Sequence, residues 1–143
     1  MRRVYSEGVN VYDAANERIK FIFDNFPKIY VSFSGGKDSG CMVNLMVDYM
    51  RKNGITKKIG LMIMDNEANY EDSLKFMHEI IQANLDLLDV YWCCMPISLP
   101  CSVSQYAVDW QCWGEGDKDR WIRPMPENDY IVNINNHEFD FFW

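Results

Sequence analysis

The 143-residue sequence contains no apolar run long enough to cross a membrane, and Met1-Arg2-Arg3 is followed by mixed polar residues rather than an apolar signal segment. We therefore expect a cytoplasmic protein with no membrane contact. Basic residues are also scarce, because 14 lysines and arginines stand against 21 aspartates and glutamates, for a net charge of −7. Non-specific binding to a nucleic acid backbone needs clustered cations, so we do not expect that activity.

Histidine is limited to two residues and cysteine to five, and no C-x-x-C pair occurs. Zinc sites usually pair their ligands at C-x₂₋₄-C spacing, whereas Cys93 and Cys94 are adjacent and point to opposite faces of a strand. We expect both thiols to be buried and reduced, with no zinc, no iron–sulfur cluster and no disulfide framework. Cys101 and Cys112 lie in a less regular segment and are kept as candidate reactive thiols.

Two common phosphate-binding signatures are missing, since the sequence has neither a Walker A loop nor a G-x-G-x-x-G fingerprint. A β-type run at 29–33 leads instead into a loop, and a helical apolar pattern begins at Cys41. The loop is Ser34-Gly35-Gly36-Lys37-Asp38-Ser39. Its glycines allow a tight turn, and the first N–H groups of the next helix point into that turn. The arrangement predicts a phosphate cradle in which the serines donate hydroxyl groups, Lys37 supplies a cation, and Asp38 binds Mg²⁺ or caps the helix.

Hydrophobic periodicity predicts an alternation of helices and strands along the chain. Helices are expected at 10–26, 41–53 and 70–81, and strands at 29–33, 59–64, 87–94 and 130–134. Pro27 closes the first helix, Gly54 follows the second, and Asn69 is the candidate cap of the third. This order predicts an α/β fold with parallel strands in one sheet.

Asp65 follows the expected strand at 59–64, at the edge where parallel strands end and ligands bind. Its carboxylate is a candidate for binding Mg²⁺ or a ribose, and the alternative is that it caps a turn. Glu67 and Glu71 are explained more simply as a turn residue and a first-turn helix residue.

The segment 95–128 differs from the rest, because it holds four of the five prolines and three of the five tryptophans. We expect a short helix at 104–110 and a turn at 114–117, with residues 95–143 forming an aromatic-rich lid and tail of a single domain spanning 1–143. One group in this segment combines aromatic and basic side chains: Trp110, Trp113, Trp121, Lys118, Arg120 and Arg123. It either contacts a nucleotide base, phosphate or sulfate, or forms core and solvated surface, and Arg123 is the favoured functional member.

All six loop positions match S-G-G-x-D-S. The loop thus resembles the PP-loop of the adenine nucleotide α-hydrolase-like superfamily, which contains the N-type ATP pyrophosphatases and the phosphoadenosine phosphosulfate (PAPS) reductases. The residues 30–39 and Met64-Asp65 resemble the PAPS reductase branch, and 92–97 with 121–126 resemble its IbrA-like subgroup. The resemblance implies a minimal three-layer αβα, HUP-like fold with a mostly parallel sheet.

The resemblance also implies which residues bind and react. Adenine nucleotide, either ATP or PAPS, would contact the loop residues and their neighbours: Phe33, Ser34, Gly35, Gly36, Lys37, Asp38, Ser39, Met64 and Asp65. Lys37, Asp38 and Arg123 are the implied catalytic residues, and Asp38 and Asp65 the implied Mg²⁺ ligands.

Three functions remain open from the sequence. With ATP and Mg²⁺, cleavage between the α- and β-phosphates would adenylate an unknown acceptor. Sulfonucleotide reduction would need Cys101 or Cys112 as its thiol, because the C-terminal Glu-Cys-Gly-x-His-like motif of PAPS reductases is missing. A non-catalytic module would sense a nucleotide and bind a ParB-like protein or a second copy of the chain.

Overall fold

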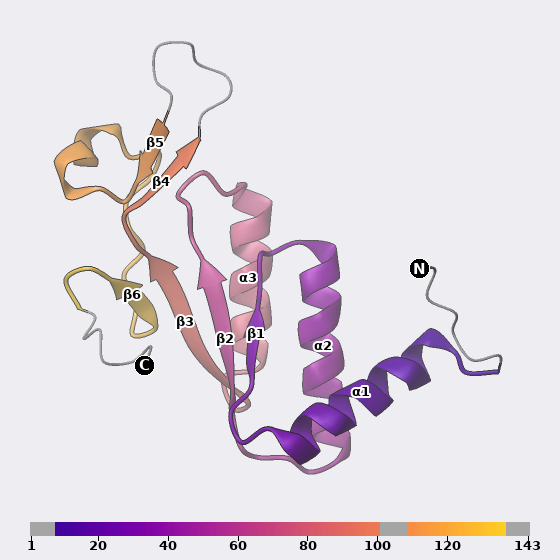
Figure 1. The fold of residues 1–143 in the computed structure, drawn as a ribbon. Coiled ribbons are helices and arrows are strands. Elements are labelled where there is room, and N and C mark those ends of the chain that lie inside the picture. Colours follow the sequence, from indigo (N-terminus) through magenta and orange to yellow (C-terminus); the bar gives the residue numbers. More distant parts are fainter. Residues whose placement is uncertain (1–7, 101–108, 137–143) are drawn as a thin grey trace.

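The computed structural model describes residues 8–100 and 109–136 (Figure 1). Its helices are α1 (Val11–Asn25), α2 (Lys37–Lys52), α3 (Glu71–Ala83) and the 3₁₀ helix η1 (Glu115–Arg120). The main sheet contains β1 (Tyr30–Ser32), β2 (Ile59–Met64), β3 (Leu88–Cys94) and β6 (Ile131–Asn133), in the order β1-β2-β3-β6 with every neighbouring pair parallel. A separate antiparallel pair is formed by β4 (Ile97–Pro100) and β5 (Asp109–Cys112).

The structure confirms an α/β fold whose mostly parallel sheet is flanked by helices. Alternate residues of the strands face α2 and α3 and are buried, because a strand turns successive side chains to opposite faces. The core on this side contains Val31, Phe33, Leu61, Ile63, Trp92, Val43, Met46, Met50, Met77 and Ile81. The connections β1–α2–β2 and β2–α3–β3 therefore bring the ends of β1 and β2 to one edge of the sheet, where the predicted loop lies (Figure 1).

The other face of the sheet is less covered. Tyr30 is 56% exposed and Met64 is 48% exposed. The ring of Tyr30 lies over Gly60, where a Cβ would come within 2.1 Å of a ring carbon. Glycine at position 60 thus allows an aromatic side chain to cover the central strand.

The predicted start of α1 and the predicted end of α2 are confirmed. α1 begins after Asn10, whose side chain accepts a hydrogen bond from the Asp13 N–H at 2.9 Å. α2 ends in a Schellman motif: the Ile55 N–H donates to the Met50 carbonyl at 2.9 Å, and Gly54 adopts a φ of +63°.

Two predictions about helix starts were wrong. α2 begins at Lys37 rather than Cys41, with Gly36 as its N-cap residue, so the second half of the predicted loop is the first helical turn. α3 is preceded by Tyr70 rather than capped by Asn69. The Asn69 amide instead donates to the Asp65 carboxylate at 3.2 Å, a tertiary bond that local sequence does not reveal.

The helix predicted at 104–110 was wrong where the structure describes it, because residues 109 and 110 belong to β5. Residues 104–108 and the aromatic tail lie outside the described residues. The segment predicted to be irregular contains β4, β5 and η1, whose strand pairing depends on contacts that periodicity does not show. In the described part of the chain, no helix has the length and apolarity needed to cross a membrane.

Candidate functional site

The loop predicted from the S-G-G-x-D-S motif joins β1 to α2 at the carboxyl edge of the sheet. Its two serines hold it in a turn. The Ser34 and Ser39 hydroxyl oxygens are 3.0 Å apart, the Ser34 N–H donates to Ser39 Oγ at 3.3 Å, and Ser39 Oγ donates to the Gly36 carbonyl at 3.1 Å. These bonds close the loop around its glycines without any contribution from another element.

Gly35 meets two separate demands. It adopts a φ of +73°, which L side chains rarely take, and a Cβ at this position would lie 2.4 Å from Cε of the buried Met77. Gly40 makes a similar approach, since its Cβ would lie 2.9 Å from the Phe76 ring. The loop and the start of α2 therefore press closely against α3, which fixes the loop relative to the core.

The exposed side of the loop presents backbone donors. The first intrahelical bond of α2 runs from the Gly40 N–H to the Gly36 carbonyl at 2.9 Å. The N–H groups of Lys37, Asp38 and Ser39 have no acceptor among the described residues. Three unsatisfied donors and the positive end of the helix dipole thus converge on one exposed turn, an arrangement suited to an anion.

Lys37 and Asp38 are both exposed in this first turn. Neither side chain forms an ion pair or hydrogen bond with the described part of the protein. Lys37 is therefore free to reach a bound anion, and Asp38 can supply a single carboxylate to a metal ion held mainly by the ligand.

Two other predicted contact residues lie differently. The Phe33 side chain is buried in the core, with its ring edge-on to that of Phe76 at 6.0 Å, so only its backbone borders the loop. Met64 ends β2 with its side chain on the less covered face of the sheet.

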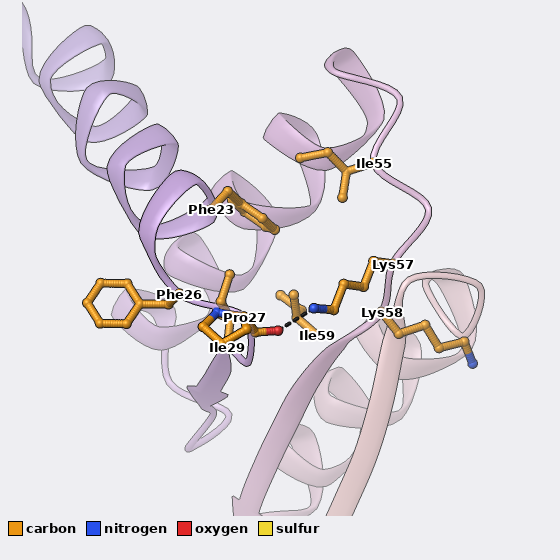
Figure 2. Close-up of a pocket in the computed structure, with 8 residues that line it drawn as sticks. All are labelled: Phe23, Phe26, Pro27, Ile29, Ile55, Lys57, Lys58 and Ile59. Atoms are coloured by element: carbon orange, nitrogen blue, oxygen red, sulfur yellow. Dashed lines mark hydrogen bonds between the residues drawn. The ribbon is translucent and has the colours of Figure 1, made fainter.

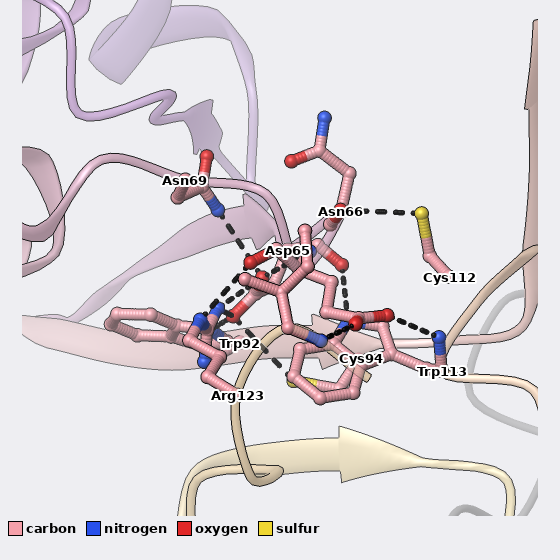
Figure 3. A network of polar contacts seen from close by, with 10 residues as sticks. Asp65, Asn66, Asn69, Trp92, Cys94, Cys112, Trp113 and Arg123 are labelled. Carbon is pink, nitrogen blue, oxygen red and sulfur yellow. Dashed lines mark hydrogen bonds and ion pairs between the residues drawn. The ribbon is translucent and has the colours of Figure 1, made fainter. Parts of the chain in front are cut away.

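Asp65 is fully buried, and a dense set of donors surrounds its carboxylate (Figure 3). Arg123 Nη2 lies 2.5 Å from both carboxylate oxygens, and Trp92 Nε1 donates to Oδ2 at 2.6 Å. The Glu67 N–H donates to Oδ1 at 2.8 Å, the Asn69 amide donates to the same oxygen at 3.2 Å, and the Cys94 thiol donates to Oδ2 at 3.8 Å. The Asp65 backbone carbonyl accepts from Trp113 Nε1 at 2.6 Å.

Glu67 is the second fully buried carboxylate at this edge. It adopts a φ of +66°, and its side chain accepts the backbone N–H of Trp113 at 3.1 Å and that of Ile122. Its own carbonyl accepts from Arg123 Nε at 3.2 Å. Sequence reasoning missed this role, because no local pattern indicates that a turn glutamate binds a segment about 50 residues further along the chain.

Asp65, Glu67 and Arg123 together form a network, called here the edge network, that joins the end of β2 to residues 112–123. Cys112 adds a contact from its Sγ to the Asn66 carbonyl at 3.2 Å (Figure 3). Trp113 is buried beneath Arg123, whose guanidinium carbon is 5.0 Å from the ring centroid. The edge network thus anchors the predicted lid on the sheet, and it occupies the side chains of Asp65 and Arg123 that were predicted to meet ligand.

The remaining cations of the lid are also paired. Lys118 Nζ lies 2.6 Å from Glu115 and Arg120 lies 3.4 Å from Asp117, all within η1. Trp121 is half-buried and donates to the Gly114 carbonyl at 3.2 Å.

The cysteines of β3 lie where the sequence predicts. Cys93 and Cys94 are both buried and, as successive strand residues, face opposite sides of the sheet. Burial raises the pKa of both thiols, and the nearby Asp65 carboxylate raises the pKa of Cys94 further. Cys112 is buried as well, and Cys101 lies outside the described residues.

A small hollow of about 60 Å³ lies at the opposite, amino edge of the sheet (Figure 2). Phe23, Ile29, Ile55 and Ile59 line it, and the Lys57 ammonium at its rim donates to the Pro27 carbonyl. Its position at the start of β1 and β2 separates it from the predicted loop by the length of the strands.

The described residues contain no group of three or more His, Cys, Asp or Glu side chains placed to hold a metal ion. Asp65 does not fit a metal site in this arrangement, because its carboxylate is fully buried and already bound by nitrogen donors from four residues and by the Cys94 thiol. Asp38 fits one carboxylate contact to a metal that a phosphate ligand carries, which is the usual way in which proteins bind Mg²⁺.

The fold and the loop define a class of protein: an α/β domain with a parallel sheet and a serine–glycine turn at the start of the helix after its first strand. Comparison with known proteins adds one similarity. The chain is 36% identical over 121 residues, or 84% of its length, to the uncharacterized protein YbdN of Escherichia coli (strain K12). The chain spans 29% of the length of that relative. No family model matches the chain, and no solved structure matches it.

Proposed function

We propose that residues 34–39 bind the phosphate groups of an adenine nucleotide, and that the protein is a PAPS reductase-like member of the PP-loop superfamily with an HUP-like, three-layer fold. The observation that carries the proposal is the exposed turn itself. Within the described part of the chain, it combines three backbone N–H groups without acceptors, two serine hydroxyls, a lysine without an ion pair, and glycines at the points of closest approach. The six-residue match to the PP-loop supports the same ligand class.

The reaction that fits this site best is nucleotide cleavage between the α- and β-phosphates. An acceptor nucleophile forms a bond to the α-phosphorus, the bond from that phosphorus to the bridging oxygen breaks, and pyrophosphate leaves. The N–H groups of residues 37–39 and the Lys37 ammonium would stabilise the charge that develops on the phosphate oxygens, and the loop would fix the α-phosphate for attack. Mg²⁺, carried by the nucleotide and contacted by Asp38, would neutralise the leaving pyrophosphate.

In this proposal, Arg123 and Asp65 do not touch the nucleotide and instead position a neighbouring segment. Their buried ion pair holds residues 112–123 over the end of β2, so they would shape the wall beside the nucleotide. Sulfonucleotide reduction through Cys112 is less favoured, since that thiol is buried against Asn66 and would have to become exposed to react, whereas Cys101 lies outside the described residues. A ParB-like partner or a second copy of the chain remains a prediction.

The test is calorimetric titration of the full chain with ATP, AMP and 3′-phosphoadenosine 5′-phosphate, followed by product analysis with ATP and Mg²⁺. The blocking variant is Gly36→Trp, because Gly36 has an ordinary φ of −80° and a Cβ there meets only Ser34 Oγ, at 3.4 Å. Gly35→Trp would be a poor choice, since the same replacement there would collide with Met77. Gly116→Trp is the matched control, because a Cβ at Gly116 contacts nothing within 4 Å.

We expect the wild-type chain and the control variant Gly116→Trp to bind nucleotide. The variant Gly36→Trp should lose this binding. With water as the acceptor in place of the unknown nucleophile, AMP and pyrophosphate are the expected products, and the proton of the attacking water is released to solvent. Formation of ADP with phosphate would contradict cleavage at the α-phosphorus, and equal binding by Gly36→Trp would contradict the assigned loop.

A further inference from the structure

The main sheet has two edge strands, and β6 is the one whose outer side is closed (Figure 1). The Ile131 N–H donates to the Asn128 carbonyl at 3.2 Å. The Asn136 side chain donates to the Ile131 carbonyl at 2.7 Å and accepts the Asn133 N–H at 2.8 Å. A turn and an asparagine side chain thus occupy backbone groups through which a further strand would pair.

β1 is the other edge strand, and its outer side is open. The Ile29 carbonyl and the Phe33 N–H bond to β2, at 2.9 and 2.8 Å. Backbone groups of alternate strand residues point to opposite sides, so Tyr30 and Ser32 turn their N–H and carbonyl groups away from β2. None of these backbone groups has a hydrogen-bond partner within residues 8–100 and 109–136.

No side chain of β1 shields this outer side. The Tyr30 ring leans inward over Gly60, and its centroid lies 6.0 Å from that of the Tyr91 ring. Edge strands are usually protected by a charged side chain, a proline or a bulge. The strand Tyr30-Val31-Ser32 has none of these, and its register with β2 is regular. An unprotected edge of this kind is suited to pairing with another strand.

A second copy of β1 fits this edge in the antiparallel direction. A two-fold axis at Val31 places Tyr30 opposite Ser32 of the partner subunit, and such a pair exchanges both of its N–H···O bonds. The two symmetry-related pairs use every outward backbone group of both strands. An axis at Tyr30 would need Lys28, which lies in a bend. An axis at Ser32 would need the Ser34 N–H, which already donates within the loop.

The antiparallel direction also brings unlike charges together, because it sets the amino edge of one sheet beside the carboxyl edge of the other. At the amino edge, Lys58 pairs with Asp89 at 3.6 Å, whereas Lys28 and Lys57 are exposed and have no carboxylate partner in the described part of the chain. At the carboxyl edge, carboxylates outnumber lysines in the starts of α2 and α3, with Asp38, Glu71 and Asp72 against Lys37 and Lys75. This charge complementarity favours a second copy of the chain as the occupant of the edge.

From the open edge, its self-complementary spacing and these charges, we infer that the protein forms a two-fold dimer through β1. In the same register, Lys28 of the partner subunit lies opposite Ser34 and so beside the turn at residues 34–39. Each copy therefore supplies a cation to the phosphate-binding turn of the other. The role of Lys28 rests on the proposed function, whereas the pairing of β1 does not depend on it.

The pairing is tested by light scattering of the full chain across a dilution series. We expect the wild-type mass to be twice that of the 16.9 kDa chain. Ser32→Pro removes one outward N–H and no bond to β2, and proline is tolerated at such an edge position, so this variant should be monomeric. Ser32→Ala keeps the N–H and is the matched control, which should remain dimeric.

Hydrogen exchange provides a second measurement that needs no variant. The Tyr30 and Ser32 amides should be protected in the dimer, and their exchange should accelerate by about tenfold or more on dilution to the monomer. The Phe33 amide is the internal control, because its bond to the Met62 carbonyl lies within one chain. This measurement decides the pairing even if Ser32→Pro does not fold.

The position of Lys28 is tested by titration with ATP and Mg²⁺. Lys28→Gln should weaken binding by about two- to fivefold in the dimer, because a cation beside the phosphates is lost. In the monomeric Ser32→Pro background the same replacement should have no effect, since the affected turn belongs to the other copy.

The outcomes separate this inference from the proposed function. A monomeric wild-type chain, a Ser32→Pro variant that dimerises as tightly as the wild type, or an unprotected Ser32 amide would overturn the pairing of β1. Equal effects of Lys28→Gln in the dimer and in the monomer would overturn its placement across the interface. A dimer that binds no nucleotide would support the pairing and contradict the function proposed for residues 34–39.

Discussion

Replacement of Arg123 by methionine removes the cation of the edge network while keeping most of the apolar stem. The Arg123 side chain is 20% exposed, and it lies over Trp113, so the lost contribution is mainly the ion pair with the fully buried Asp65. Breaking a buried pair by removing one partner costs about 3–5 kcal/mol. We expect the lower end, about 3 kcal/mol, because Asp65 keeps four other donors, of which Trp92 Nε1 at 2.6 Å is the closest.

The assay is urea unfolding of the full chain, with stability taken from the midpoint at an unchanged m-value. The double variant Asp65→Asn/Arg123→Met removes both charges and should recover at least about 1.5 kcal/mol relative to Arg123→Met alone. Arg120→Met is the control, because that side chain is 77% exposed and its pair with Asp117 should contribute less than about 1 kcal/mol.

A loss below about 1 kcal/mol in Arg123→Met would refute the reasoning, because it would mean that Asp65 does not depend on Arg123 for its charge compensation. Equal losses in the single and double variants would also refute it. In that case the destabilisation would come from packing over Trp113 rather than from an unpaired carboxylate.

Gly35→Ala should lower the free energy of unfolding by about 2–4 kcal/mol, because it combines a positive φ with a collision in the core. Gly54 also has a positive φ but has open space around it, so Gly54→Ala should lower the free energy of unfolding by only about 1–2 kcal/mol. Equal losses at the two positions would contradict the close packing of the loop on α3. Glu67→Ala leaves the Trp113 N–H without its acceptor, so hydrogen exchange at that amide should accelerate by about tenfold or more, and unchanged exchange would count against the lid anchor. Because the pKa of Cys94 is raised in the folded protein, its contribution to stability is fully present below the ordinary thiol pKa of about 9 and is lost as the pH rises from there toward the folded value. At pH values above 9, the urea midpoint of the wild-type chain should therefore decrease with pH more steeply than the midpoint of Cys94→Ala.

The edge network and the loop divide two tasks at the same edge of the sheet. The loop is exposed and keeps unsatisfied donors, which suits a ligand that comes and goes. The edge network is buried, and the carboxylates of Asp65 and Glu67 are both bound by donors, which suits a permanent attachment of residues 112–123. A ligand at the loop would therefore meet a wall whose position is set before it binds, which lowers the cost of ordering the site.

Local sequence was sufficient to predict most of the helices and strands and the turn at residues 34–39. The strand at 59–64 and the helix at 11–25 follow from hydrophobic periodicity, and Gly54 at the end of α2 follows from the preference of glycine for a positive φ. The turn at residues 34–39 was predictable because its conformation depends on glycines and serines that are neighbours in the chain. These interactions join residues that are close in the sequence, so they can be predicted from the local sequence alone.

Only the tertiary structure decided the roles of Asp65, Glu67 and Arg123. Sequence reasoning favoured Asp65 and Arg123 as ligand contacts and treated Glu67 as an ordinary turn residue. The fold instead buries Asp65 and Glu67, half-buries Arg123, and joins them through contacts that cross more than 50 positions. The physical reason is that a carboxylate has the same chemistry whether it binds a metal, a ribose or an arginine. What distinguishes these roles is burial and the identity of the donors around it, and both come from the folding of distant segments onto one edge of the sheet.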